Sequence, residues 1–154
     1  MWQRIQTVFL VLVILSMAIG LFYPMAVGTD GVVTYKLFAL QFSVFNADGQ
    51  QVTYFPYSVT AILMIAAATI ALMEIKRFDN RIVQIKMGTL NSLVLMGVMG
   101  SSVFFIYNLP GKYTATWQNG FGLWVLFAGV TFNWLAVRFI RRDEKLVKDS
   151  NRLR

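Results

Sequence analysis

The chain contains no cysteine and no histidine. It therefore lacks a disulfide framework, a thiolate metal site, the commonest metal ligand and the usual general base. Charged residues are scarce as well, at 14% of the 154 residues, whereas 57% are apolar and the mean hydropathy is +0.60. This composition excludes a water-soluble enzyme, because so much apolar surface needs lipid. We expect no catalytic residue, no metal and no cofactor.

Four long stretches of the sequence carry no charged residue. A helix needs roughly 20 residues to cross a hydrocarbon core of about 30 Å. The uncharged stretches predict four transmembrane helices, at about residues 7–27, 56–73, 87–109 and 117–137. The shortest, 56–73, leaves a soluble core helix open as an alternative. The first is longer than the apolar region of a signal peptide, so we expect it to remain uncleaved, although residues 26–28 resemble a cleavage site.

Positive charge is distributed unevenly between the two sides of these spans. Of the 14 Lys and Arg residues, only Lys36 and Lys112 fall in the loops after the first and third spans. Basic residues accumulate on the cytoplasmic side of a membrane. Both termini, the loop 74–86 and the basic tail 138–154 are therefore predicted to be cytoplasmic, in a single integral membrane domain of residues 1–154.

The longest segment between two spans follows the first one. Two apolar–polar alternations flank the turn-forming cluster 46–49, which is typical of a β-hairpin, and the run 32–38 can add a third strand. The predicted fold class is an all-α membrane protein, a four-helix bundle with a small hairpin or three-stranded sheet within 31–55. The sheet either caps the helices or serves as a platform for a partner. The second outer loop, 108–119, is expected to hold only a turn.

Among the polar residues inside the predicted spans, three lie five residues from the nearest charge at the cytoplasmic end: Thr69, Asn91 and Asn133. Equal spacing predicts a similar depth, so the three side chains can meet in one polar layer. Asn91 and Asn133 are expected to hydrogen-bond across the third and fourth spans. The layer either holds the helices together or forms a small polar site for an ion or a headgroup.

The segment after the fourth span continues without Gly or Pro, which predicts that the helix runs on into the cytoplasm. Four basic residues fall on one face of this continuation: Arg141, Lys145, Lys148 and Arg152. Such a stripe is typical of a segment that docks on anionic lipid headgroups, or on a partner protein. It accounts for the isoelectric point of about 10.0 without nucleic acid as a partner.

Two terminal blocks are distinctive in sequence. They comprise Gln3, Arg4, Ile5, Gln6 and Thr7 at the start, and Arg141, Arg142, Asp143, Glu144, Lys145, Leu146, Val147, Asn151, Arg152, Leu153 and Arg154 at the end. These blocks resemble the family called domain of unknown function 4293, four-helix bacterial membrane proteins of about this size. The resemblance implies an inner membrane protein of a Gram-negative bacterium. It implies no activity and assigns no functional residue.

These patterns predict a non-catalytic accessory or scaffold subunit of a larger membrane complex, with the bilayer and one or more membrane proteins as partners. The alternative is a small transporter or channel-like protein that uses the layer of Thr69, Asn91 and Asn133. Transporters usually place charges or broken helices at mid-membrane, and the spans contain neither. An intramembrane enzyme is disfavoured because no His, Cys, Asp or Glu lies within a predicted span.

Overall fold

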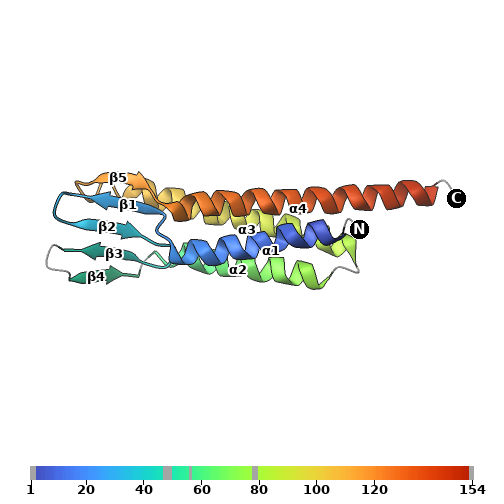
Figure 1. The fold of residues 1–154 in the computed structure, drawn as a ribbon, viewed down its shortest axis with the longest axis horizontal. Coiled ribbons are helices and arrows are strands. Elements are labelled where there is room, and N and C mark those ends of the chain that lie inside the picture. The colour runs from blue at the N-terminus through green and yellow to red at the C-terminus, as the bar shows by residue number, and fades with distance from the viewer. Residues whose placement is uncertain (1–2, 47–49, 56, 78–79, 153–154) are drawn as a thin grey trace.

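The computed structural model, which describes residues 3–46, 50–55, 57–77 and 80–152, contains four long helices and an antiparallel sheet (Figure 1). The helices are α1 (Gln3–Phe22), α2 (Val59–Lys76), α3 (Arg81–Asn108) and α4 (Phe121–Arg152). The strands are β1 (Ala26–Thr29), β2 (Thr34–Leu37), β3 (Phe42–Phe45), β4 (Gln51–Tyr54) and β5 (Thr116–Asn119). The chain is thus a helical bundle with a sheet at one end.

The four helices form an up-and-down bundle. α1 packs against α2 and α4, and α3 packs against the same two helices. The sheet extends from one end of the bundle, whereas the two termini and the connection between α2 and α3 lie at the other (Figure 1). α4 is the longest helix and projects beyond the ends of the other three.

The prediction of an all-α fold class is wrong, because the sheet has five strands rather than the two or three expected. Its order is β4-β3-β2-β1-β5, with every neighbouring pair antiparallel. The two unexpected strands, β1 and β5, come from regions for which other structures were predicted. β1 occupies the end of the predicted first span, and β5 lies in the second outer loop, where only a turn was expected.

The pairing of β1 with β5 explains why both strands were missed. Neither segment alternates apolar and polar residues as β3 and β4 do, and each is stabilised by a partner distant in sequence. Gly28 stands opposite Trp117, and a Cβ built on Gly28 would lie 2.9 Å from the indole ring. The indole therefore packs directly on the backbone of β1.

Local sequence sets where the helices begin and end. α1 stops at Phe22 ahead of Pro24, since the residue before a proline is disfavoured in a helix. α3 begins at Arg81, where the side chain of Asn80 caps the helix by accepting a hydrogen bond from the Val83 N–H at 3.2 Å. The connection between α2 and α3 is therefore much shorter than the predicted loop 74–86.

Hydrogen bonds and rings join the sheet to the helix ends. The Ala61 N–H at the start of α2 donates to the carbonyl of Ala39 at 3.1 Å, and the Gly122 N–H of α4 donates to the carbonyl of Pro24 at 3.0 Å. Phe42 of β3 is fully buried and packs against the tilted ring of Tyr57, with 5.7 Å between ring centroids. The sheet is therefore fixed rigidly to the bundle.

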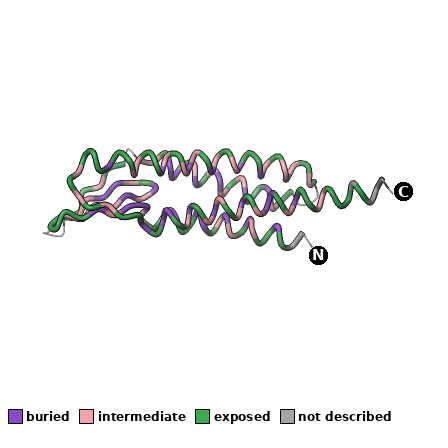
Figure 2. The backbone as a smooth tube through the Cα atoms, turned by 90° about the horizontal axis from the view of Figure 1, so that it is seen from above, coloured by how far each residue is buried: buried purple, intermediate pink, exposed green. Residues whose placement is uncertain are grey.

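Exposed residues run along all four helices (Figure 2), and many of them are large and apolar. Large side chains such as Ile62, Leu93, Met96 and Trp124 are more than 60% exposed. All four helices are long and apolar enough to cross a membrane, and only a minority of the residues in each is buried within the molecule. So many exposed apolar side chains are typical of a surface that contacts lipid or protein.

Candidate functional site

A cluster of buried polar side chains lies between the helices, toward the end of the bundle that carries the termini. Asn91 of α3 and Asn133 of α4 are both at most 1% exposed. The Asn91 Nδ2 group donates to Asn133 Oδ1 at 3.0 Å, which confirms the predicted hydrogen bond. Asn133 Nδ2 in turn donates to Ser92 Oγ at 2.9 Å and to the carbonyl of Gly88 at 3.3 Å. One asparagine of α4 thus bridges three residues of α3.

Glu74, in the last turn of α2, belongs to the same region. The sequence suggested that this residue begins a cytoplasmic loop, but its side chain is fully buried. Its carboxylate lies beside Gly88, where a Cβ would be 2.9 Å from Glu74 Oε1. Gln84 Nε2 donates to the backbone carbonyl of Glu74 at 3.1 Å. Glu74 therefore contacts α3 at Gly88, whose carbonyl also accepts the hydrogen bond from Asn133.

Gly88 makes this approach of three helices possible. Any Cβ at this position would also lie 2.5 Å from Val137 Cγ2 of α4. A real Cβ does not tolerate that distance, so only glycine leaves room for both Val137 and the Glu74 carboxylate. The buried cluster depends on a residue that carries no side chain of its own.

Three oxygens of the cluster accept no hydrogen bond within the described part of the chain: both carboxylate oxygens of Glu74 and Asn91 Oδ1. Burial of unpaired acceptors is costly, and such groups mark places where a proton or a donor completes the site. No three His, Cys, Asp or Glu side chains come together among the described residues. The chemistry that this arrangement offers is the acceptance of a proton or a hydrogen-bond donor.

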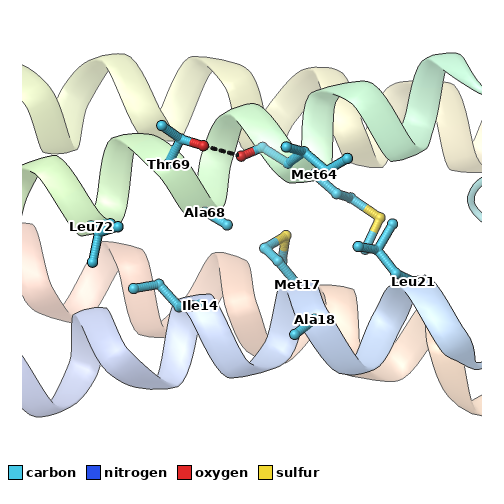
Figure 3. A pocket seen from close by; sticks show the side chains of 9 residues that line it. Ile14, Met17, Ala18, Leu21, Met64, Ala68, Thr69 and Leu72 are labelled. Atoms are coloured by element: carbon cyan, nitrogen blue, oxygen red, sulfur yellow. Dashed lines mark hydrogen bonds between the residues drawn. The ribbon is translucent and has the colours of Figure 1, made fainter.

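Thr69 does not join this cluster, so the predicted layer is wrong for that residue. Its side chain is exposed and donates to the carbonyl of Ile65 at 2.8 Å (Figure 3). It lines an apolar cavity of about 250 Å³ between α1 and α2, beside Ala68 and Leu72. Equal depth in the membrane did not imply that the side chains meet. Thr69 and Glu74 are five residues apart on α2, which corresponds to a rotation of about 140° around the helix axis, so they lie on different faces of the helix.

The basic residues of the predicted stripe lie in the C-terminal part of α4, of which only the end projects beyond α3. Arg141 reaches back to α3, where its Nη2 group donates to Thr89 Oγ1 at 3.2 Å. Lys145 is exposed. Lys148 and Arg152 belong to α4, but their side chains lie outside the described residues. Near the base of this segment Arg81 of α3 forms an ion pair with Asp143, at 3.3 Å.

A second polar–aromatic cluster lies where the sheet meets the helices. The ring of Tyr113 packs against both Tyr35 and Phe42, with centroid distances of 4.9 and 5.2 Å. Burial raises the pKa of the Tyr113 phenol above its usual 10.0, and the neighbouring phenols of Tyr57, Tyr54 and Tyr35 raise it further. Trp117 Nε1 is buried without an acceptor in the described residues. This cluster anchors the sheet by ring contacts.

Comparison with known families agrees with the resemblance of the terminal blocks. Residues 2–153 match the family described as Domain of unknown function (DUF4293). The match covers nearly the whole chain, so the protein belongs to that family. No curated protein matches the sequence.

Proposed function

We propose that this DUF4293 protein is a non-catalytic accessory or scaffold protein of the bacterial inner membrane, and that the projecting end of α4 binds a membrane protein partner. In this proposal the four helices span the membrane, both termini are cytoplasmic and the sheet lies on the opposite side. The anionic headgroups of the cytoplasmic leaflet contact the basic end of the bundle.

The distribution of charge supports this orientation. Lys36 belongs to β2 and Lys112 to the connection before β5, so both lie at the sheet end. The remaining described basic residues lie at or beyond the opposite ends of the helices. Cytoplasmic loops of membrane proteins carry such an excess of Lys and Arg.

The part of α4 that projects beyond the other helices supports the proposal that the protein binds a partner. At about 1.5 Å per residue its 32 residues extend about 48 Å, well beyond a hydrocarbon core of about 30 Å. The ion pair between Arg81 and Asp143 holds the base of the projecting segment against α3. Past it, Leu146 and Val147 are 55% and 41% exposed on a helix that also carries Lys145. Exposed apolar residues on a basic helix are typical of a segment that docks into a groove.

Affinity purification from native membranes at native abundance tests this function. The tagged wild-type chain is expected to retain a stoichiometric membrane protein in mild detergent, and Leu146→Asp is expected to lose it. Val32→Asp is the matched control, because Val32 is an exposed aliphatic residue in the connection between β1 and β2. Recovery of the chain alone under several detergents would contradict the proposal, as would equal retention by both variants.

The orientation can be tested separately, because the chain has no cysteine that would react in the background. A membrane-impermeant maleimide is expected to label Lys112→Cys in intact spheroplasts and Lys145→Cys only after lysis. The opposite pattern would overturn the proposed topology.

The buried acceptors favour one second function, a small transporter or channel-like protein. The carboxylate of Glu74 is fully buried beside Gly88, whose carbonyl accepts a hydrogen bond from Asn133, and buried carboxylates within spans are a feature of proton-coupled proteins. Under the leading proposal, liposomes that contain the protein leak protons and cations at the rate of empty liposomes. A flux that disappears in the Asn91→Leu, Asn133→Leu double variant would favour the transporter instead.

A further inference from the structure

A cavity of about 350 Å³ opens between α3 and α4 at the basic end of the bundle. Thr89 and Ser92 of α3 line one side of it. The other side comes from a single face of α4, with Trp134, Val137, Arg138 and Arg141. Two guanidinium groups, one indole and two hydroxyl groups therefore surround a space between neighbouring helices.

Contacts within the protein hold Arg138 and Arg141 in place, but in the described residues no carboxylate neutralises their charge. The Arg138 guanidinium lies over the ring of Trp134, 5.2 Å from its centroid. Arg141 is held by its hydrogen bond to Thr89 Oγ1. Within the described part of the chain neither arginine pairs with a carboxylate, and Asp143 is paired with Arg81 instead. Because a guanidinium has five N–H donors, most of those in the cavity remain for a ligand or water.

The hydroxyl groups of the cavity cannot supply further donors. Thr89 Oγ1 donates to the carbonyl of Ile85 at 2.8 Å, and Ser92 Oγ donates to the carbonyl of Gly88 at 2.9 Å. Both hydroxyls also accept a hydrogen bond, from Arg141 and Asn133 respectively. Besides the indole N–H of Trp134, the donors that a bound group would meet are therefore those of Arg138 and Arg141. Two forked cations without acidic partners suit an oxyanion, above all a phosphate.

The place of the cavity along α4 indicates where the phosphate comes from. Arg138 is the first charged residue after the apolar part of α4, and Trp134 is 56% exposed one turn earlier. Trp and Arg at such a boundary are typical of the headgroup layer. Basic pockets between helices on the cytoplasmic side bind anionic headgroups. The apolar walls given by Trp134 and Val137 suit the glycerol and the first acyl carbons of a lipid.

We propose that this cavity binds the phosphate of an anionic phospholipid, held by Arg138 and Arg141 and flanked by the indole of Trp134. The inference rests on the proposed placement of this end of the bundle at the inner membrane surface. It identifies one binding site, distinct from the projecting segment of α4 that is proposed to bind a partner.

Lipid binding to the full-length protein in mild detergent tests the proposal, with bound lipids counted by native mass spectrometry. The wild type is expected to bind phosphatidylglycerol roughly tenfold more tightly than phosphatidylcholine. Arg138→Gln and Arg141→Gln are each expected to weaken phosphatidylglycerol binding by roughly tenfold or more. Lys86→Gln is the matched control, because it removes an exposed charge from α3 outside the cavity. One surface charge changes binding by about fivefold at most.

Arg141→Lys separates geometry from charge. Lysine keeps the positive charge but lacks the forked donors, so this variant is expected to bind phosphatidylglycerol more weakly than the wild type. Its thermal unfolding midpoint without lipid is expected to equal that of the wild type, which shows that the bundle is intact.

Three results would overturn the proposal. One is equal binding of phosphatidylglycerol and phosphatidylcholine by the wild type, and another is equal weakening by the arginine variants and Lys86→Gln. The third is displacement of the lipid by inorganic phosphate alone, which would assign the cavity to a soluble phosphate. Failure of the proposed function is distinguishable, because maleimide labelling and partner retention are measured without reference to bound lipid.

Discussion

Replacement of Gly88 by alanine tests the packing on which the buried cluster depends. In a helix, alanine is favoured over glycine by about 1 kcal/mol, so propensity alone predicts a more stable protein. The structure predicts the opposite sign. The new methyl group would lie 2.5 Å from Val137 Cγ2 and 2.9 Å from Glu74 Oε1, and overpacking of this kind costs about 1–3 kcal/mol.

Gly100 on the same helix is the matched control. No heavy atom lies within 4 Å of a Cβ built there, so Gly100→Ala carries the gain in propensity without the clash. The difference in unfolding free energy between the two variants is therefore expected to be about 1–3 kcal/mol, with Gly88→Ala the less stable. Unfolding by sodium dodecyl sulfate in mixed micelles, followed by tryptophan fluorescence and circular dichroism, measures this difference.

A second substitution identifies the clashing atom. Val137→Ala removes the Cγ2 methyl group, so it is expected to be less harmful in the Gly88→Ala background than in the wild type. The two changes should couple by about 1 kcal/mol or more. Equal stability of Gly88→Ala and Gly100→Ala, or additive effects of the pair, would refute the close approach of α2, α3 and α4 at Gly88.

Other contacts give further expectations. In a double-mutant cycle, Asn91→Leu and Asn133→Leu are expected to be non-additive by about 0.6–1.7 kcal/mol, because each single change leaves a buried amide of the other unpaired; additive effects would contradict the hydrogen bond. Asp143→Asn is expected to lower the unfolding free energy by less than about 1 kcal/mol, and by nothing measurable in high salt, since the ion pair with Arg81 is partly exposed. The Tyr113 phenol is expected to ionise later than free tyrosine, which absorbance at 295 nm and Tyr113→Phe can verify. Because its folded pKa is raised, its contribution to stability is complete below pH 10 and is lost as the pH rises through the folded pKa.

The helices were predictable from local sequence because absence of charge over some 20 residues is a local property. The hydrogen bond between Asn91 and Asn133 was predictable as well, since an amide within an apolar helix needs a partner on a neighbouring one. Thr69 shows where this reasoning stops. A threonine satisfies its hydroxyl within its own helix, as the bond to the Ile65 carbonyl shows, and therefore needs no neighbour.

The features that were missed depend on residues far apart in the chain. A glutamate two residues before Lys76 has the sequence context of a solvated helix end, and only the space left by Gly88 allows it to be buried. β1 has the sequence context of an apolar span, and its identity as a strand depends on β2 and β5. No periodicity within four residues can reveal such partners.

The position of β5 at the edge of the sheet, next to β1, has a consequence for the order of assembly. β1 is synthesised before residues 30–115, and its second neighbour follows only after α2 and α3 have been made. Until residues 116–119 have been made, the edge of β1 that faces β5 lacks its partner strand, and an unpaired strand edge is a template for wrong pairing. Pairing of β5 with β1 then joins the segment after α1 to the segment before α4.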